Sequence, residues 1–284
     1  MTDEFEALRP LLLGLAYRML GSMWDAEDVV QEAYLRWLRT DREEVREPRA
    51  FLATVVSRLA LDQLRSARVT REAYPGPWLP EPVATDAAGP LDTAELRDTL
   101  SYATLHLMER LTPPERAVFV LRDAFEMPYE QVAEVVGVSA ATCRQTHRRA
   151  LGHLAAARNH GCPSRPSREE HERLLTRFLD AAAGGDLAAL KDLLSADITA
   201  WSDGGGRVTA ARRPVVGLDK VAAFILGLTS RYEISWARVV DANGQPAVLL
   251  ASGAEEQLAL ADVHEGRIHA LYIVRNPDKL QRVG

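Results

Sequence analysis

The sequence predicts a chain of several domains, in which two all-α domains are followed by an α+β domain. Three observations indicate this. Apolar residues recur at helical spacing through the first 71 residues and again from about residue 91 to residue 157. Five prolines within residues 74–90 interrupt that pattern, as in a linker. Short strand-like runs follow two further helices in the last third of the chain. The length of 284 residues fits two or three domains.

The composition is that of a soluble globular protein. Apolar residues make up 47% and charged residues 26%, which excludes a wholly disordered or collagen-like chain. No window reaches the roughly 18 apolar residues of a membrane span, and the acidic start MTDEFEALRP is unlike a secretory signal. Two cysteines give no disulfide framework. We therefore expect a cytoplasmic protein without a membrane partner.

The charge is unevenly distributed along the chain. The net charge of −6, taken alone, argues against nucleic-acid binding. Residues 1–111 carry −6, residues 112–168 carry +3 and residues 169–284 carry −3. Between Glu134 and Glu169 the chain has six arginines and no acidic residue. A short cationic stretch of this kind favours attraction to phosphate, although a solvated helix face has the same composition.

Helix signals divide the N-terminal part into three helices. Gly21 and Ser22 separate the first two, and we expect Asp25 to cap the second. Pro48 opens a long third helix over about residues 49–71. The proline linker that follows contains Trp78 and Leu79, which a purely flexible tether does not need. We expect Trp78 to dock onto a folded surface, with a solvent-exposed spacer as the alternative.

Residues 129–151 have the pattern of a helix-turn-helix. A capping box with proline at the first helical position spans residues 112–115, and Pro128 starts a short helix to Val136. Gly137 supplies the turn, Val138 is expected to pack between the helices, and Ser139 caps a further helix to about residue 157. A plain helical hairpin is the alternative.

The second helix of this motif has two distinct faces. Spacings of 4, 3 and 4 place one set of residues on the inward stripe: Cys143, His147, Ala150 and Leu154. The outward residues suit the major groove, where arginine pairs with guanine and glutamine with adenine. These outward residues are Arg144, Gln145, Arg148 and Arg149.

A zinc site is the competing interpretation of Cys143 and His147, because His160 and Cys162 follow them. The spacing of the second pair matches no common zinc finger, and the inward stripe makes the first pair core residues. We therefore expect no metal site.

The C-terminal third predicts an α+β domain. Helices are expected at about 168–183 and 186–194 and near 218–229. Strand-like runs are expected to form a curved antiparallel sheet with helices on one side; they lie at 198–201, 208–212, 234–240, 247–251, 257–263 and 268–274. The last run is apolar on both faces, so it is expected to be buried on both sides.

Three segments in order resemble the extracytoplasmic-function sigma factors of the sigma-70 family, which are promoter-recognition subunits of bacterial RNA polymerase. DAEDVVQEAYLRWL (25–38) is similar to region 2.2, and FLATVVSRLALDQLRSAR (51–68) is similar to regions 2.3 and 2.4. Residues 111–151, which include the helix-turn-helix, resemble region 4. The resemblance implies binding to the clamp and flap regions of core RNA polymerase and to promoter DNA at the −10 and −35 elements.

The same resemblance assigns roles to individual residues, with a solvated helix face as the alternative for each charged row. The acidic start of the second helix suits a basic protein partner and repels DNA; the polymerase-binding residues are Asp25, Glu27, Asp28, Gln31 and Glu32. A row on the long helix would follow the DNA backbone near the −10 element; it consists of Arg58, Asp62, Arg65 and Arg68. The outward residues of the helix-turn-helix would read the −35 element.

The C-terminal 116 residues resemble a SnoaL-like domain, the cone-shaped α+β fold also used by polyketide cyclases. Sigma factors with this extension form a subgroup that includes those called sigma factor J. Three motifs mark it: WLPEP (78–82), DGGGR (203–207) and NPDKL (276–280). The second motif is usually DGGGK, so Arg207 departs from the pattern but keeps the charge.

The subgroup resemblance implies that the extra domain is a fused regulator, held by a contact between the linker motif and the DGGGR turn. The tail motif is expected either to pack on the sigma domains or to cap the last strand. The residues expected to make regulatory contacts are Trp78, Leu79, Asp203, Gly204, Gly205, Gly206, Arg207, Asn276, Pro277, Asp278, Lys279 and Leu280.

Asp203 also has a catalytic interpretation, because enzymes of the SnoaL-like fold use an Asp or His as acid/base. Against it, an aspartate followed by three glycines is a turn sequence in which the carboxylate caps backbone amides, and glycines let another surface approach closely. We expect no catalytic residue, no cofactor and no enzyme activity, whereas a small unidentified ligand in the pocket of the fold stays open.

Two other function classes compete with the sigma factor. One is a ligand-sensing DNA-binding regulator, and the other is a SnoaL-like enzyme fused to a DNA-binding module. The predicted domain bounds are 1–73 for region 2, 74–92 for the linker with WLPEP, 93–160 for region 4, 161–168 for a second linker and 169–284 for the SnoaL-like domain.

Overall fold

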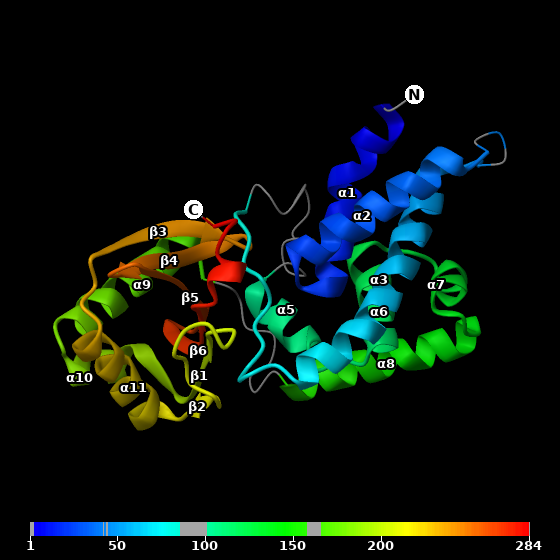
Figure 1. Ribbon diagram of the computed structural model, residues 1–284. Coiled ribbons are helices and arrows are strands. Elements are labelled where there is room, and N and C mark those ends of the chain that lie inside the picture. The colour runs from blue at the N-terminus through cyan, green and yellow to red at the C-terminus, as the bar shows by residue number, and fades with distance from the viewer. Residues whose placement is uncertain (1–2, 42, 44, 86–100, 158–165, 284) are drawn as a thin grey trace. The chain divides into compact units, whose positions relative to one another are not determined.

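The chain forms two compact units (Figure 1). The computed structural model describes residues 3–41, 43, 45–85, 101–157 and 166–283, without the side chains of residues 3, 67–72 and 157. The first unit combines Met1–Glu72 with Asp86–Asn159, and the second combines Ala73–Thr85 with His160–Gly284. Residues 74–85 of the predicted linker, together with Ala73, therefore fold with the C-terminal part of the chain. The predicted bounds at residues 92, 93, 160 and 161 lie outside the described residues.

The N-terminal part of the first unit is a bundle of three helices. These are α1 (Asp3–Leu20), α2 (Met23–Arg39) and α3 (Pro48–Glu72), in the places that the helical spacing predicts. Leu12, Leu15 and Trp37 are among the side chains buried between them. The expected cap of α2 is wrong: the Ser22 hydroxyl accepts the amide of Asp25 at 3.3 Å, so Ser22 is the N-cap and Asp25 lies in the first turn.

The rest of the first unit is also helical where the structure describes it. It contains α5 (Tyr102–Met108), α6 (Pro113–Phe119), a π-helical turn (Val120–Ala124), α7 (Tyr129–Val136) and α8 (Ala140–Ala157). The capping box is confirmed, because the Glu115 carboxylate accepts the Thr112 amide at 3.0 Å. Val138 does not pack between the helices. It is 38% exposed, because it directly follows the left-handed turn at Gly137.

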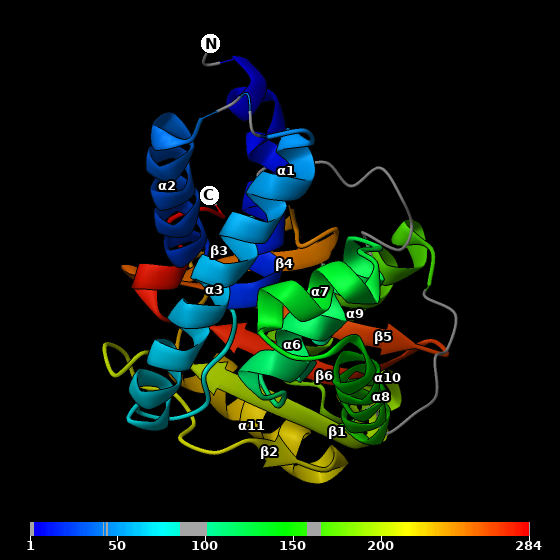
Figure 2. The same cartoon turned by 90° about the vertical axis from the view of Figure 1, so that its right-hand side faces the viewer.

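The second unit is an α+β fold, as predicted. Its helices are α9 (Arg168–Ala183), α10 (Leu187–Leu193) and α11 (Leu218–Arg231). Its strands are β1 (Leu194–Asp203), β2 (Val215–Val216), β3 (Trp236–Ala242), β4 (Gln245–Ser252), β5 (Glu255–His264) and β6 (Arg267–Val274). They form one curved sheet in the order β2-β1-β6-β5-β4-β3 (Figure 2).

Two expectations about this sheet are wrong. The sheet is mixed, because β1 runs parallel to β6 while the other neighbours are antiparallel. Residues 208–212 form no strand, and the short β2 takes that place beside β1. The amides of Arg207 and Val208 both bond to the carbonyl of Gly204, so the chain is still turning where the strand was expected to begin.

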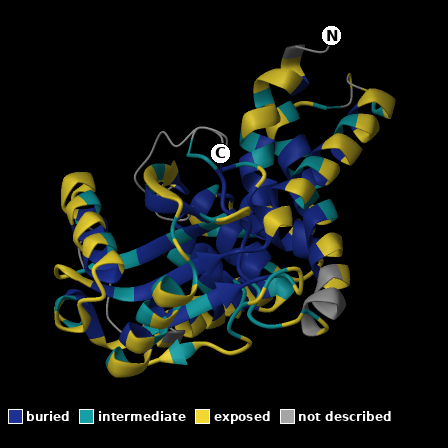
Figure 3. Ribbon diagram, turned by 60° about the vertical axis from the view of Figure 1, so that its left-hand side comes forward, coloured by how far each residue is buried: buried dark blue, intermediate teal, exposed yellow. Residues whose placement is uncertain are grey.

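A single apolar core joins the helices and the sheet of the second unit. It includes Phe178 from α9, Ile225 from α11 and Leu271 from β6. Strand β6 is buried on both faces along most of its length, as its sequence predicts. Figure 3 shows buried and exposed residues along the ribbon, with the exposed ones gathered on the outer faces of the helices and in the loops. Among the described residues, no helix is both long and apolar enough to cross a membrane.

Candidate functional site

The outward face of α8 carries the residues predicted to read DNA. Arg144, Gln145, Arg148 and Arg149 are all exposed, whereas the four residues of the inward stripe are all buried. The 3.6-residue period of the helix therefore separates the two sets as the sequence indicates. Their role in reading the −35 element stays a prediction.

The exposed side chains of α8 differ in what they contact. The Arg144 guanidinium lies 5.5 Å from the Tyr129 ring centre and 3.7 Å from the Glu130 carboxylate. Arg149 lies 3.7 Å from Glu115. Gln145 and Arg148 contact no other side chain by a hydrogen bond or ion pair within the described part of the chain. They are the members of this face that are free to engage a ligand without breaking an internal contact.

His147 is a satisfied core histidine. Its Nδ1 atom lies 2.8 Å from the Tyr129 hydroxyl, and its Nε2 atom lies 2.6 Å from the Asp123 carboxylate. Burial raises the pKa of the Cys143 thiol, which disfavours the thiolate that a metal requires. Within the described residues no group of three or more potential ligands lies close enough to hold a metal; His160 and Cys162 lie outside them.

The predicted −10 row lies on the exposed side of α3. Arg58 donates to the carbonyl of Glu134 on α7 at 3.1 Å, and Arg65 pairs with Asp62 at 3.3 Å. Arg58 is thus engaged by the region-4 helices of the same unit. The side chain of Arg68 lies outside the described residues.

The predicted polymerase face on α2 is exposed at Asp28, Gln31 and Glu32 and half-buried at Asp25 and Glu27. Glu32 pairs with Arg36 at 2.9 Å, and Asp25 accepts the Gln63 amide at 3.4 Å.

Sequence reasoning missed an apolar component of the same face. Trp24, Leu35 and Leu38 are 50%, 40% and 53% exposed. With Asp28 and Gln31 they follow spacings of 4, 3, 4 and 3, so all five share one side of the helix. The signal in the sequence was a second row of apolar residues on α2, beside the row that packs into the core.

In the second unit the three sequence motifs meet around one buried carboxylate. Asp203, at the end of β1, is 1% exposed. Its Oδ1 atom accepts the Tyr74 hydroxyl at 2.7 Å and the Gly205 amide at 3.0 Å. Its Oδ2 atom accepts the Leu79 amide at 3.0 Å and pairs with the Lys279 ammonium at 2.8 Å. We call this cluster the linker clasp; it consists of Tyr74, Trp78, Leu79, Asp203, Asn276 and Lys279.

Lys279 completes the clasp from the tail motif. Its ammonium also donates to the carbonyl of Leu79 at 2.5 Å and lies 3.2 Å from the Trp78 ring centre, a cation–π contact. Asn276 donates to the Tyr74 hydroxyl at 3.1 Å. Burial, with the hydrogen bond to Asp203 second, raises the pKa of Tyr74 above its ordinary value, so the phenol stays protonated. The expected docking of Trp78 is thus onto the second unit itself.

The glycines of the DGGGR turn make room for the clasp. Gly205 and Gly206 have positive φ values of 61° and 71°. A Cβ atom on Gly205 would collide with Asn276, and one on Gly206 would lie 2.9 Å from Pro75. Arg207 lies outside the buried cluster, on the surface, where it pairs with the exposed Asp278 at 3.1 Å. Pro277 is exposed beside it, whereas Leu280 is buried.

The linker continues along the edge of the sheet beyond the clasp. Val83 and Asn243 exchange two bonds: the Val83 amide donates to the Asn243 side chain at 3.2 Å, and the Asn243 amide donates to the Val83 carbonyl at 3.0 Å. The Ala84 amide reaches the carbonyl of Arg282. Tyr74 and Asn243 were missed by sequence reasoning, because neither lies in a recognised motif.

The geometry speaks against acid/base chemistry by Asp203. Both carboxylate oxygens are occupied by protein donors, which include the Lys279 ammonium at 2.8 Å. A general base needs an oxygen within reach of a substrate proton. The turn interpretation of Asp203 is supported instead, since the carboxylate caps the Gly205 amide.

Comparison with known proteins gives consistent matches along the chain. The Sigma-70 region 2 family matches residues 5–70, and the Sigma-70 region 4 family matches residues 102–154. The chain is 42% identical to the ECF RNA polymerase sigma factor SigJ of Mycobacterium tuberculosis, over 98% of this chain and 92% of that protein. It is 33% identical to the probable ECF RNA polymerase sigma factor SigI of the same organism, over 99% and 94%.

A solved structure resembles the whole chain. The crystal structure of the Mycobacterium tuberculosis extracytoplasmic function sigma factor SigJ matches with a TM-score of 0.79 and 36% identity, over 100% of this chain and 99% of that one. The match includes the C-terminal α+β unit. The helix-turn-helix, the region 2 helices and the near-complete coverage of these relatives together show that the chain belongs to the extracytoplasmic-function sigma factors of the sigma-70 family, which bind core RNA polymerase and direct promoter-specific initiation.

Proposed function

We propose that the exposed faces of the first unit divide the work of initiation as the family resemblance implies. The α8 residues would contact the −35 element, with Gln145 and Arg148 carrying most of the readout because, among the described residues, neither side chain has a competing hydrogen bond or ion pair. The α3 row would contact the −10 element. The mixed acidic and apolar face of α2 would bind the polymerase clamp, and region 4 would bind the flap. We propose that the protein carries out this role in the cytoplasm, together with the polymerase.

We further propose that the second unit regulates the sigma factor by holding the linker. The observation that carries this proposal is the buried Asp203 carboxylate, which binds Tyr74 and Leu79 of the linker. Residues 73–85 connect region 2 to region 4 in the sequence. When the clasp binds these residues, it fixes the path of the chain between region 2 and region 4. When the clasp releases them, the two DNA-binding regions can take other positions relative to each other. Covalent attachment gives an effective concentration of order millimolar, so a modest contact is enough.

The other function classes fit these contacts less well. A conventional ligand-sensing regulator has no use for the exposed acidic and apolar face of α2, which we propose binds polymerase. An enzyme fused to a DNA-binding module would need a reactive group free to meet substrate, and Asp203 is committed to the clasp. We therefore propose that the second unit has no catalytic role.

Run-off transcription with reconstituted holoenzyme tests the regulatory proposal. Lys279→Met removes the buried ammonium, and we expect at least a threefold change in transcript yield with unchanged binding to core polymerase. Lys220→Met is the matched control, because Lys220 is an exposed lysine on α11 of the same unit. Unchanged yields for both Lys279→Met and Asp203→Asn would contradict regulation through the clasp.

A further inference from the structure

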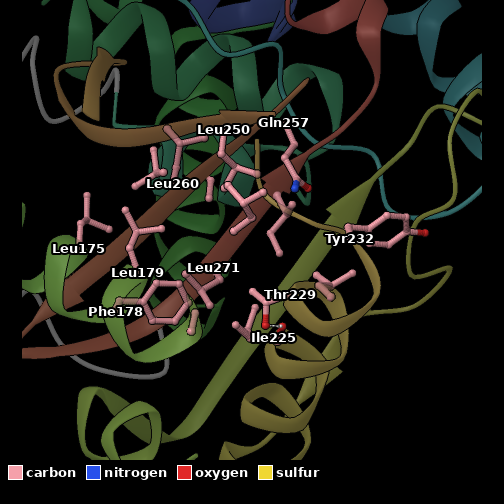
Figure 4. A pocket seen from close by; sticks show the side chains of 16 residues that line it. Leu175, Phe178, Leu179, Ile225, Thr229, Tyr232, Leu250, Gln257, Leu260 and Leu271 are labelled. Atoms are coloured by element: carbon pink, nitrogen blue, oxygen red, sulfur yellow. Dashed lines mark hydrogen bonds between the residues drawn. The ribbon is translucent and has the colours of Figure 1, made fainter. Parts of the chain in front are cut away.

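The second unit contains a pocket between its helices and its sheet (Figure 4). Its empty space, the open mouth included, is about 730 Å³. Helices α9 and α11 form one side, and strands β4, β5 and β6 form the other. Thirteen of the sixteen lining residues are aliphatic or phenylalanine, and none carries a formal charge. Concave, mainly apolar sites with a few polar groups are typical of small-molecule binding.

The three polar residues of the lining are not equivalent. The Thr229 hydroxyl donates back to the carbonyls of its own helix, to Leu226 at 3.2 Å. The Tyr232 hydroxyl is directed away from the apolar side chains (Figure 4). The Gln257 amide lies among the lining side chains in the same view and, within the described residues, has no side-chain hydrogen bond. The pocket thus offers one side-chain amide, that of Gln257, which is available for hydrogen bonding and surrounded by apolar side chains.

This arrangement selects the chemistry of an occupant. A buried charge without a partner is costly, and the lining has no residue to compensate it. An apolar molecule gains free energy from burial, and one polar group on it can pair with the amide. We propose that the pocket binds a small, uncharged, mainly apolar ligand with one hydrogen-bonding group, held by Gln257, and passes its occupancy to the linker clasp.

The route from the pocket to the clasp runs through Arg275. Strand β6 carries the lining residues Leu271 and Ile273 and leads directly to Arg275. The Arg275 guanidinium lies 5.0 Å from the ring centre of Tyr232, at the edge of the pocket. Its backbone amide donates to the carbonyl of Asp203 at 2.7 Å. A ligand that shifts β6 or Tyr232 therefore acts on Arg275, whose backbone amide binds Asp203 of the clasp.

Such coupling requires that the ligand bind the two states of the clasp with different affinities. This part of the inference rests on the proposed regulatory function, whereas the binding site itself does not.

Binding is tested on the full chain with Nile red, an uncharged apolar dye. We expect one dye per chain, with blue-shifted emission. Ala259→Leu places bulk on the lining and is expected to weaken binding at least tenfold. Leu179→Trp fills the pocket from a different lining residue and is expected to weaken binding as well. Ala237→Leu, on the exposed strand β3, is the matched control and is expected to bind as the wild type does. Absent binding, or equal binding by all four proteins, would overturn the site.

The ligand class is tested by displacing Nile red with matched naphthalenes. We expect 2-acetylnaphthalene, which is neutral and has one acceptor, to compete at least tenfold better than the anion 2-naphthoate. Gln257→Leu is expected to abolish the advantage of 2-acetylnaphthalene over 2-ethylnaphthalene, which has no acceptor. Equal competition by the anion would contradict an uncharged ligand, and an unchanged preference in Gln257→Leu would contradict the amide contact.

Coupling is tested by hydrogen exchange at the Leu79 amide, which bonds to Asp203. We expect saturating Nile red to change its exchange rate at least threefold in the wild type and not in Ala259→Leu. Binding without this change would overturn the coupling. The dye measurements need neither polymerase nor DNA, so a failed pocket is distinguishable from a failed clasp, which the Lys279→Met transcription measurement reports.

Discussion

Asp203 and Lys279 are both buried, so each charge depends on the other. Their side chains are 0% and 7% exposed and lie 2.8 Å apart. Removing one partner of a buried pair leaves an uncompensated charge and costs roughly 3–5 kcal/mol, whereas removing both costs much less than the sum. The clasp is therefore a cooperative unit at the scale of single residues.

A double-mutant cycle measures this dependence. We expect Asp203→Asn and Lys279→Met each to lower the opening free energy at the Leu79 amide by about 3 kcal/mol, and the double variant to lose at least about 1.5 kcal/mol less than the sum. Hydrogen exchange gives that free energy. Arg207→Ala is the control: its pair with Asp278 is exposed, so its effect is expected to stay below about 0.5 kcal/mol. Strict additivity of the two buried substitutions would refute a coupled pair.

A buried histidine makes the first unit sensitive to acid. Burial lowers the pKa of His106 from 6.5 to about 4. Because the unfolded state takes up the proton first, stability is complete above pH 6.5 and is lost as the pH falls from about 6.5 towards 4. The shift predicts a loss of roughly 2 kcal/mol between pH 7 and pH 5.

His106→Gln is expected to remove most of this pH dependence, since glutamine does not titrate. The measurement is the opening free energy of the Leu105 and Met108 amides at pH 7 and pH 5. The same loss in wild type and variant would mean that another group titrates.

Sequence reasoning reached some of these residues and not others. The turn role of Asp203 follows from its three glycines, because a short local pattern determines it. Its contact with Tyr74 spans 129 positions in the chain, so nothing local indicates it. Likewise, the spacing on α8 predicts four outward residues, but the acids Glu115 and Glu130 that engage two of them come from other helices.

At the scale of elements, α8 is the part of the fold whose sequence pattern and structure agree most closely. Arg148 is exposed and has no internal ion pair within the described residues. We expect Arg148→Ala to weaken holoenzyme binding to promoter DNA by about 1–3 kcal/mol, which is roughly 5- to 150-fold in affinity. The loss should shrink on a promoter with a scrambled −35 element. Fluorescence anisotropy checks both.

Arg177→Ala is the matched control for that measurement, because Arg177 is an exposed arginine on α9 of the other unit. An equal loss in the two variants would show that charge, rather than the recognition helix, determines the effect.

The sheet shows why strand connections are harder to predict than strands. Most of the predicted runs became strands, because alternation and turn residues are local. The parallel pair of β1 and β6 joins segments more than 60 residues apart, with α11 and the four strands β2, β3, β4 and β5 between them in the chain. The apolar character of both faces of β6 was consistent with a parallel neighbour, since parallel strands are buried on both sides, but it does not identify which strand that neighbour is.

At the scale of the whole molecule, the net charge of −6 is expected to limit DNA binding by the free chain. The acidic excess lies before residue 112 and after residue 168, whereas residues 112–168 carry +3. The local positive charge attracts phosphate over a Debye length of about 10 Å at 0.1 M salt. Acidic segments on both sides repel the same DNA, and lower salt extends that repulsion.

The free chain is therefore expected to bind promoter DNA at least a hundredfold more weakly than the holoenzyme at 0.15 M salt. Because its own attraction and repulsion grow together as salt falls, its affinity should rise less steeply with dilution than that of the holoenzyme, in which polymerase adds phosphate contacts. The measurement is a titration of the free chain and of the holoenzyme on one labelled promoter, at salt concentrations between roughly 0.05 and 0.2 M. It gives, for each species, the slope of log affinity against log salt concentration. A free chain that matches the holoenzyme in affinity would contradict this expectation. It would show that residues 112–168 bind DNA without hindrance from the acidic segments, and that polymerase positions the sigma factor without strengthening its electrostatic attraction to DNA.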